Sequence, residues 1–365
     1  MIAQVIAPAQ IGGLETVVGQ LLRSAHDARE PMACVALMDE AAPLPAEFEA
    51  LHQLDIPIVR LAAPHRQYVT QYRSVVSALR GLHARVAHTH GAHADVLGGL
   101  AARSVGIPQM STLHGFIDGG RKQRLFEWLQ LRQLRSAAAV VAVSSGIVER
   151  ACRAGVPGDR IHLIPNAAPE SPVLSRSDAR ERLGLPAGGA VIGWVGRVSH
   201  EKGPEAFVDV IAALQGDPEI MGVMIGDGPR LPAVRELGGA LISSGRLRLL
   251  GSIAEARQLL SAFDVLALTS VTEGTPMVVL EAMRAGVPVV STQVGGVPAL
   301  LADGAGSLVE YGDWTAFARA VEAVLFTSGM ASRIREHAFA RVRADYALDR
   351  WWERYDDLYQ RLNRR

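Results

Sequence analysis

Two glutamates, Glu273 and Glu281, lie in the segment whose residue types and spacing are best suited to chemistry. The apolar residues 265–269 before them predict a strand. Thr275 and Pro276 then predict a helix start, with threonine as the N-cap and proline at the first helical position. Each carboxylate can accept two hydroxyl hydrogen bonds, which suits a sugar on one side and a ribose on the other. A loop charge and a solvated helix residue are the alternative, but Glu281 has apolar sequence neighbours, among which an unpaired carboxylate would be costly.

The same helix start offers backbone hydrogen-bond donors. Gly274 follows the predicted strand, and ligands of open α/β sheets bind beyond the carboxyl ends of strands. The first amides of a helix have no intrahelical acceptor. We therefore expect the amides of Met277 and Val278 to point at a bound anion or sugar oxygen.

A cationic loop follows the predicted strand 190–195. It begins at Gly196, carries Arg197 and Lys202, and ends where Pro204 opens the next helix. Two cations at the carboxyl end of a strand suit a diphosphate, because arginine can bind phosphate in a fork and lysine as a point charge. Only Lys122 and Lys202 among the 37 basic residues are lysine, which singles out this position. An ordinary surface loop with a lysine–glutamate pair is the alternative.

In the N-terminal half, glycines and one histidine occupy comparable loops. Gly12 and Gly13 precede a helical segment and resemble a turn that admits a phosphate, although the dinucleotide fingerprint Gly-x-Gly-x-x-Gly is absent. His114 ends the apolar segment 109–113 and precedes Gly115, so we expect its side chain to project into the ligand crevice. The other histidines have no metal-ligand spacing and no Asp-x-Asp triplet occurs, so we predict no metal site.

Apolar segments of strand length alternate with amphipathic segments in both halves, which is typical of βαβ units with a parallel sheet. The predicted strands are residues 2–7, 32–37, 56–60, 86–89, 109–113, 139–143 and 161–164, then 190–195, 222–225, 246–250, 265–269, 288–291 and 307–309. Between the two series, residues 165–186 lose the periodicity and are rich in proline, which predicts a linker. The sequence therefore predicts an α/β fold with two doubly wound domains, at residues 1–169 and 170–345.

A C-terminal helix is predicted at residues 346–365. An apolar and aromatic stripe runs along one of its faces: Trp351, Trp352, Tyr355, Leu358, Tyr359 and Leu362. Such a stripe must be buried. We expect it to pack on a domain of this chain, with oligomerisation as the alternative.

Composition excludes several classes of protein. The 365 residues carry 37 basic and 37 acidic side chains, so the chain lacks the field that would attract nucleic acid. The two cysteines, Cys34 and Cys152, cannot form a disulfide framework and fit a reducing cytoplasm. No secretory signal and no uninterrupted apolar stretch of about 18 residues is visible. Residues 121–135 open as a basic amphipathic segment, which suits either an ordinary packed helix or a helix on an anionic membrane surface.

Taken together, these segments resemble glycosyltransferase family 4, whose members are retaining enzymes of the GT-B fold. The matching motifs follow one another through nearly the whole chain: Gly12-Gly13-Leu14-Glu15, Thr112-Leu113-His114-Gly115, Val143-Ser144, Ile164-Pro165-Asn166, the loop from Gly196 to Gly203, Gly226-Asp227-Gly228-Pro229, and Glu273 to Glu281 with the following Ala285-Gly286-Val287-Pro288-Val289-Val290. The resemblance implies two facing Rossmann-like domains, the first binding the acceptor and the second the donor, and a final helix that returns to the first domain.

The resemblance also implies roles for the polar residues of the second half. Arg197 and Lys202 would neutralise the donor diphosphate. Glu281 would bind the ribose hydroxyls and Glu273 the hydroxyls of the transferred sugar. The amides of residues 274–278 would surround phosphate and sugar, and Pro276 within this segment is among the donor-binding positions that the resemblance implies.

Further implied contacts come from other loops. The base would lie near Ser252 and Ile253, while Gly13 would approach the donor phosphate and His114 the reacting sugar. One residue departs from the family pattern, because Ala299 stands where a glutamate is usual.

The resemblance implies a retaining transfer of sugar from a UDP- or GDP-linked donor to a glycan or lipid-linked acceptor in cell-surface polysaccharide biosynthesis. We expect this reaction to need no cofactor and no metal, in the cytoplasm or at the inner face of the cytoplasmic membrane. A nucleotide-sugar epimerase of the same fold and a non-catalytic sugar-nucleotide-binding protein are the alternatives. A Rossmann oxidoreductase is disfavoured by the missing dinucleotide fingerprint.

Overall fold

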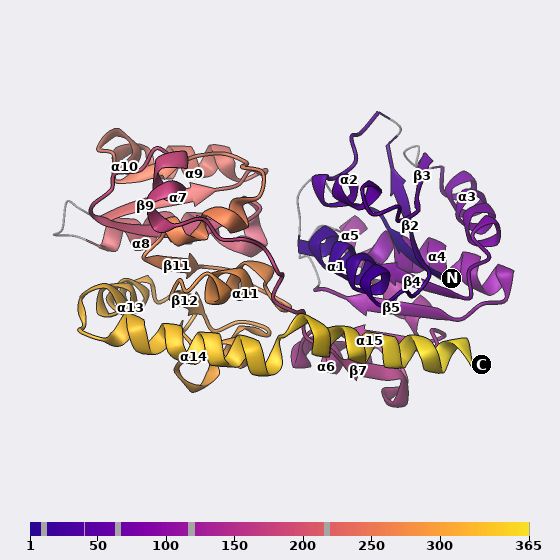
Figure 1. Cartoon of the computed structure of the whole chain (residues 1–365). Coiled ribbons are helices and arrows are strands. Elements are labelled where there is room, and N and C mark those ends of the chain that lie inside the picture. Colours follow the sequence, from indigo (N-terminus) through magenta and orange to yellow (C-terminus); the bar gives the residue numbers. More distant parts are fainter. Residues whose placement is uncertain (9–12, 40, 63–66, 116–120, 215–219, 365) are drawn as a thin grey trace. The chain divides into compact units, whose positions relative to one another are not determined.

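The chain forms two compact units, each built on one parallel β-sheet (Figure 1). The computed structural model describes residues 1–8, 13–39, 41–62, 67–115, 121–214 and 220–364. The first unit comprises Met1–Asn166 and Asp349–Arg365, and the second comprises Ala167–Leu348. Most strands of both sheets are largely buried, which explains why they are nearly continuous apolar segments in the sequence.

The first unit holds a seven-stranded sheet in the order β3-β2-β1-β4-β5-β6-β7. Its strands are β1 (Ile2–Ile6), β2 (Met32–Met38), β3 (Ile58–Ala62), β4 (Val86–His90), β5 (Gln109–Leu113), β6 (Ala139–Ala142) and β7 (Ile161–Leu163). Its helices are α1 (Gly13–Asp27), α2 (Ala46–His52), α3 (Tyr68–Gly81), α4 (Ala92–Val105), α5 (Arg121–Leu134), α6 (Ser145–Arg153), the 3₁₀ turn η1 (Gly158–Arg160) and the final helix α15 (Leu348–Asn363). The strand order reverses between β1 and β4, which makes the carboxyl ends of these strands the expected ligand edge.

Different helices cover the two faces of this first sheet. Ala3 and Val5 of β1 lie in a core cluster with alanines of α4 and leucines and valines of α3. Gln4 points to the opposite face, where its amide contacts the Tyr359 hydroxyl of α15. The aromatic stripe of α15 is buried there, with Trp351, Tyr355, Leu358, Tyr359 and Leu362 among its buried residues. The stripe therefore packs within the first unit.

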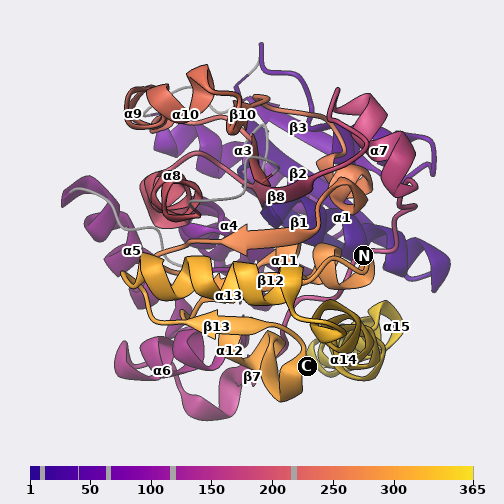
Figure 2. The same ribbon diagram turned by 90° about the vertical axis from the view of Figure 1, so that its left-hand side faces the viewer.

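The second unit holds a six-stranded sheet in the order β10-β9-β8-β11-β12-β13. Its strands are β8 (Ala190–Val195), β9 (Ile220–Ile225), β10 (Leu247–Leu249), β11 (Val265–Leu268), β12 (Val289–Thr292) and β13 (Ser307–Val309). Its helices are α7 (Arg176–Arg182), α8 (Pro204–Ala213), α9 (Leu231–Leu237), α10 (Gly239–Ser243), α11 (Met277–Arg284), α12 (Val297–Leu300), α13 (Trp314–Phe326) and α14 (Met330–Asp345), with 3₁₀ turns η2 (His200–Lys202), η3 (Ala256–Ala262) and η4 (Ala302–Gly304). Helices α8 and α13 lie together over this sheet (Figure 2), and both contribute to its core cluster. The reversal of strand order falls between β8 and β11.

The structure corrects the predicted linker. Residues 165–186 contain α7, whose N-cap Ser175 accepts a hydrogen bond from the Asp178 amide at 3.2 Å. Arg180 on this helix is 2% exposed; it donates to the Asp264 carboxylate at 2.8 Å and to backbone carbonyls of residues 186–189 and 262. Tertiary contacts of one arginine thus order a segment whose local sequence showed no apolar periodicity.

Most predicted strands differ from the observed ones by one or two residues at their ends, and two boundary differences involve prolines. Strand β3 begins at Ile58 instead of residue 56, which fits the missing amide hydrogen of Pro57. Helix α11 begins at Met277 with Pro276 as the N-cap, so Thr275 is not the N-cap and Pro276 is not the first helical residue. The shift amounts to one residue. It still leaves the amides of Met277 and Val278 in the first turn.

Candidate functional site

Strands β8 and β11 are neighbours in the second sheet, so the loops that follow them lie side by side at its carboxyl edge. Thr269 ties the two loops together. Its hydroxyl accepts a hydrogen bond from the Trp194 indole at 3.2 Å and donates to the carbonyl oxygen of Gly203 at 2.7 Å. A backbone bond from the Val271 amide to the Glu201 carbonyl, at 2.9 Å, adds a second tie. The two predicted groups of site residues therefore meet at the topological switch point, where α/β sheets bind ligands.

Glycines allow these loops to approach one another backbone to backbone. Gly203 has φ +58°, and a Cβ there would lie 2.1 Å from the Thr269 carbonyl oxygen. Gly295 has φ +53°, and a Cβ there would lie 1.7 Å from the Glu273 carbonyl oxygen. Any larger residue would clash and would also be strained at these angles. The loop that carries Glu273 is therefore fixed from both sides.

Lys202 and Glu273 form a direct ion pair in this edge. The Lys202 ammonium donates to both carboxylate oxygens of Glu273, at 2.7 Å to Oε1 and 2.9 Å to Oε2. The Ser270 hydroxyl donates to Oε1 at 2.7 Å. The Glu273 side chain is only 6% exposed and the Lys202 side chain 28%, so the carboxylate is held in place and largely shielded from water. Two residues that the sequence assigned to different substrate groups thus contact each other.

The remaining predicted residues of the second unit lie in loops at the same edge or on α11, and no direct contact joins them among the described residues. Arg197 is exposed in the loop after β8, and no partner for its side chain occurs among the described residues. Glu281 is half-buried on α11. Ser252 is exposed and Ile253 is half-buried in the loop after β10. This loop is bonded to the loop after β9, because the Gly226 amide donates to the Gly251 carbonyl at 2.8 Å.

The backbone positions predicted to bind the donor line the same loops. Gly274, Thr275, Pro276 and Met277 are buried, Val278 is half-buried, and Gly196 is half-buried at the end of β8. The Gly296 amide donates to the Gly274 carbonyl at 3.0 Å, which links the loop after β12 to the start of α11.

The residue that departs from the family pattern is held through its backbone. Ala299 lies on α12 and is exposed. Its carbonyl oxygen accepts two hydrogen bonds from the Arg341 guanidinium, at 3.0 Å from Nε and 2.7 Å from Nη2. No carboxylate is offered at this position. An arginine of α14 instead fixes the end of this turn.

In the first unit, His114 follows β5 directly and contacts a second histidine. Its Nε2 lies 3.1 Å from Nδ1 of His90, the last residue of the neighbouring strand β4. Its Nδ1 atom is buried and has no hydrogen-bond partner in the described part of the chain. Burial lowers the pKa of His114 to about 4 and holds the pKa of His90 well below its usual range. Both imidazoles are therefore neutral near pH 7.

Sequence reasoning missed the polar residues behind His114. Gln4, His88 and His90 are buried in the central strands β1 and β4, and Tyr359 of α15 contacts both Gln4 and His88. A signal was present, because polar residues inside an otherwise apolar parallel strand must find partners when buried. The sequence does not show which strands and helices supply those partners.

Gly13 is exposed as the first residue of α1, after β1, whereas Gly12 lies outside the described residues. The side chains of residues 121–124, which open the basic stretch on α5, are likewise not described. Within the described residues, no group of three or more histidine, cysteine, aspartate or glutamate side chains could hold a metal ion. No described helix is long and apolar enough to cross a membrane.

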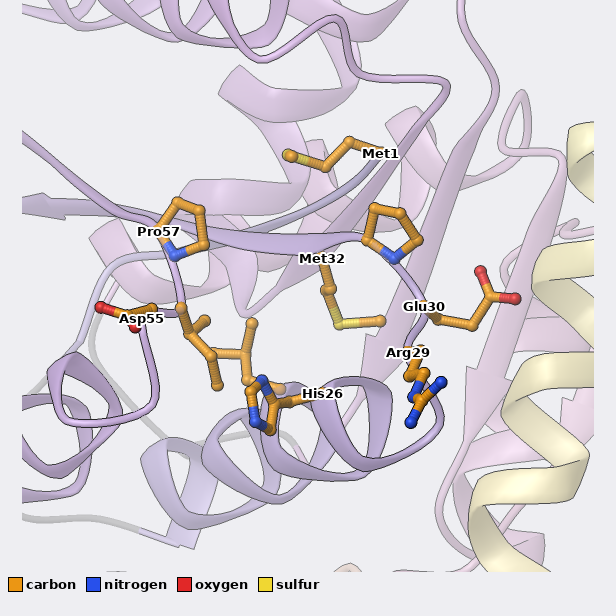
Figure 3. A pocket seen from close by; sticks show the side chains of 10 residues that line it. Met1, His26, Arg29, Glu30, Met32, Asp55 and Pro57 are labelled. Carbon is orange, nitrogen blue, oxygen red and sulfur yellow. The ribbon is translucent and has the colours of Figure 1, made fainter.

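A shallow pocket of about 200 Å³ lies at the opposite edge of the first sheet (Figure 3). Met1 and Met32 line it at the amino ends of β1 and β2, together with His26 near the end of α1 and Asp55 before β3. Ligand sites of open α/β sheets lie at the carboxyl ends of the strands. None of the predicted site residues lines this pocket, and we assign it no role.

Comparison with known proteins follows the same division of the chain. A family model described as "Glycosyltransferase Family 4" matches residues 11–170, and one described as "Glycosyl transferases group 1" matches residues 189–326. Alpha-maltose-1-phosphate synthase of Mycolicibacterium smegmatis is 30% identical over 287 residues, which cover 70% of this chain and 73% of that protein. The Escherichia coli UDP-Gal:alpha-D-GlcNAc-diphosphoundecaprenol alpha-1,3-galactosyltransferase is 27% identical over 251 residues, or 65% of each chain.

A solved structure extends the similarity over the whole chain. The crystal structure of Anabaena Alr3699/HepE in complex with UDP-glucose matches with a TM-score of 0.83 at 23% identity, and covers 98% of this chain and 99% of that one. At this level of identity the likeness concerns the fold. Together with the two parallel sheets, it confirms the predicted architecture of two Rossmann-like units of the GT-B type.

Proposed function

The chain belongs to glycosyltransferase family 4, and from that premise we propose that it moves a sugar from a nucleotide-diphosphate donor to a glycan or lipid-linked acceptor. The observation that carries this proposal is the Lys202–Glu273 pair at the carboxyl edge of the second sheet. It joins a cation suited to phosphate to a carboxylate suited to sugar hydroxyls. Two similar proteins favour a UDP-linked donor: Anabaena Alr3699/HepE, which was crystallised with UDP-glucose, and the Escherichia coli galactosyltransferase, which is named for UDP-Gal.

Unused hydrogen-bonding capacity in the pair supports these roles. An ammonium carries three hydrogens, and Lys202 donates two hydrogen bonds to the Glu273 carboxylate. The third can meet a diphosphate oxygen. Glu273 Oε2 accepts only from Lys202 among the described residues, which leaves a lone pair for one sugar hydroxyl. The exposed Arg197 adds a second cation for the diphosphate on the same loop.

Other contacts in the proposal rest on the resemblance and on position. We assign the amides at the start of α11, at Met277 and Val278, to phosphate or sugar oxygens. Glu281, inside the same helix, would accept from the ribose hydroxyls, and the base would lie near Ser252 and Ile253. From the first unit, Gly13 would approach the phosphate.

The proposed reaction retains configuration at the anomeric carbon. The bond between this carbon and the diphosphate oxygen breaks, and its electron pair leaves with the diphosphate. The acceptor oxygen bonds to the same face, and its proton passes to the departing diphosphate. Lys202 and Arg197 would stabilise the charge that develops on the leaving group, so that catalysis consists mainly of positioning and electrostatics.

We further propose that the first unit touches the inner face of the cytoplasmic membrane. Val69, Leu125 and Trp128 are exposed apolar residues of α3 and α5, and the rings of Tyr68 and Phe126 lie 6.1 Å apart between these helices. The adjoining start of α5 is basic in sequence. An apolar patch beside basic residues suits an anionic lipid surface.

Sedimentation with vesicles tests the membrane proposal. The protein should sediment with phosphatidylglycerol vesicles and not with phosphatidylcholine vesicles, and Leu125→Ser with Trp128→Ser should weaken sedimentation. Equal recovery with both lipids, or no loss in the double variant, would exclude this surface.

A screen of nucleotide sugars tests the proposed activity. A donor present at 100 times its dissociation constant should stabilise the folded protein by about 2.7 kcal/mol and raise its melting temperature. The stabilising donor is then incubated with and without acceptor glycans, and the product is analysed by proton NMR. Transfer with the original anomeric configuration is expected. An inverted product would contradict retention, and isomerised sugar formed without acceptor would identify an epimerase.

A further inference from the structure

A line of buried hydrogen bonds runs from the last helix to the candidate sugar-contacting histidine. The Gln4 amide nitrogen lies 3.0 Å from the Tyr359 hydroxyl, and the Gln4 Oε1 lies 2.7 Å from Nε2 of His90. Nδ1 of His90 then lies 3.1 Å from Nε2 of His114. We call these four residues the histidine relay. Strands β1 and β4, the loop that follows β5, and helix α15 contribute one residue each.

The orientation of the Gln4 amide sets the direction of the relay. Its nitrogen also lies 3.1 Å from the Met32 sulfur, which can only accept a hydrogen bond. The two amide hydrogens are thus donated to the Met32 sulfur and the Tyr359 hydroxyl. The carbonyl oxygen faces His90, and because that oxygen can only accept, Nε2 of His90 must carry a hydrogen.

The tautomer of His90 determines that of His114 by the same reasoning. A neutral imidazole has one N–H, and burial keeps His90 neutral by holding its pKa well below the usual range. Nδ1 of His90 is therefore an acceptor, so Nε2 of His114 must donate to it. His114 is neutral as well, with its pKa lowered to about 4 by burial, and its Nδ1 is left as a bare acceptor.

The side branch of the relay fits the same assignment. The Tyr359 hydroxyl receives a hydrogen from Gln4, so its own hydrogen can go to Nδ1 of His88 at 2.8 Å. Nε2 of His88 then donates to the Thr112 hydroxyl at 2.8 Å. All three histidines have the same tautomer, and each donor in the network meets an acceptor. The one polar atom left over is Nδ1 of His114, which is buried and unpartnered within the described residues.

We propose that Tyr359, Gln4 and His90 are positioning residues that hold His114 as its Nε2–H tautomer and so present Nδ1 as a hydrogen-bond acceptor to a hydroxyl of the donor sugar. The sugar contact rests on the proposed function, whereas the tautomer does not. A bare nitrogen lone pair accepts from a hydroxyl but has no hydrogen for a carboxylate or phosphate. The relay therefore favours a neutral sugar over an acidic one at the position that His114 contacts.

Nitrogen NMR of the free enzyme tests the tautomer directly. In protein labelled with ¹⁵N-histidine, the His114 signals, assigned by their loss in His114→Asn, should show a protonated Nε2 and an unprotonated Nδ1 from pH 8 down to about pH 5. A protonated Nδ1, or an averaged mixture of tautomers, would overturn the proposal. This measurement needs no donor or acceptor, so it stands even if sugar transfer is not found.

Two phenylalanine variants on the same face of α15 provide a matched comparison. Tyr359→Phe removes the hydroxyl that holds the Gln4 amide, whereas Tyr355→Phe removes a hydroxyl whose hydrogen-bond partner among the described residues is Thr112, at 3.2 Å. Both tyrosines are buried, so the loss of one oxygen should affect folding similarly. Tyr359→Phe should give a mixture of His114 tautomers and lower kcat/KM about 5- to 150-fold, as when a buried group is left without its partner. Tyr355→Phe should leave both unchanged.

The outcomes separate the relay from the proposed function. If Tyr359→Phe keeps the wild-type tautomer, or if both variants lose kcat/KM equally, the relay is refuted. If the tautomers behave as expected and no nucleotide sugar is turned over by any form, the relay stands and the proposed function fails. An analogue of the accepted donor that lacks the contacted hydroxyl should be turned over equally poorly by wild type and Tyr359→Phe.

Discussion

Replacing Lys202 with methionine should expose how the carboxylate of Glu273 is stabilised. The substitution keeps the apolar stem and removes two charge-assisted hydrogen bonds, at 2.7 and 2.9 Å, from a side chain that is 6% exposed. Among the described residues, the bond from Ser270 is the one that remains. Breaking a buried ion pair costs about 3–5 kcal/mol. Because Lys202 is 28% exposed, water can replace part of its contact, and we expect a loss of about 2 kcal/mol of the free energy of unfolding.

Thermal and urea unfolding measure this loss. For a domain of 150–250 residues, about 1 kcal/mol corresponds to about 2–4 °C, so the transition of the second unit should fall by about 4–8 °C. Glu273→Gln removes the carboxylate charge itself and should restore most of this stability in the double variant. The coupling energy from this double-mutant cycle isolates the pair. Arg197→Met is the matched control on the same loop, and its melting temperature should not change, because Arg197 is exposed.

Steady-state kinetics separate the structural from the catalytic role of Lys202. Under the proposed function its contact with the diphosphate strengthens as the sugar departs, so Lys202→Met should lower kcat more than it raises KM. One charge-assisted hydrogen bond corresponds to about 10- to 150-fold in rate. Arg197→Met should lower activity without loss of stability. A coupling energy near zero would refute the ion pair, and unchanged kcat and KM in folded Lys202→Met would refute the placement of the diphosphate.

Three further predictions follow from the same site and from the buried histidines. Glu281→Gln should mainly raise KM with kcat nearly unchanged, because a ribose contact is similar in ground and transition states; steady-state kinetics in which kcat alone falls would contradict this. Activity should survive a chelator; loss that magnesium or manganese restores would show a metal requirement. The free energy of unfolding of the first unit, measured by urea unfolding, should be lower at pH 5 than at pH 6. The unfolded chain takes up protons at its histidines below about pH 6.5, whereas burial lowers the pKa of His88, His90 and His114 in the folded chain; His114, with a pKa of about 4, alone contributes about 1.4 kcal/mol per pH unit. Burial raises the pKa of Asp95 to about 6, which offsets part of this loss; equal stability at both pH values would contradict the burial of these histidines.

The fold was largely predictable because parallel strands buried on both faces leave a strong signal. β5, β8 and β13 have the predicted bounds, and the other strands are shifted by one or two residues at their ends. Helix α7 was not predictable in this way. Its residues are mostly charged, and its order depends on the buried contact between Arg180 and Asp264, which are distant in sequence.

The site was predictable in its residue types but not in its contacts. The sequence places Lys202 and Glu273 after strands, yet only the sheet order, with β11 beside β8, makes them partners. In the first unit, the apolar surroundings of His114 predict a position in a crevice. The tautomer depends on Gln4 and Tyr359, which lie at opposite ends of the chain.

The two units prepare their polar groups by different physical means. In the second unit, Lys202 and Glu273 meet in an ion pair, and Arg197 is exposed to water. In the first unit, burial without any counter-ion keeps His90 and His114 neutral, and hydrogen bonds alone decide which nitrogen carries the proton. A leaving diphosphate needs positive charge, which an imidazole with a pKa of about 4 cannot supply at neutral pH. In the proposed reaction, Arg197 and Lys202 therefore stabilise the negative charge on the leaving diphosphate, and His114 orients the sugar.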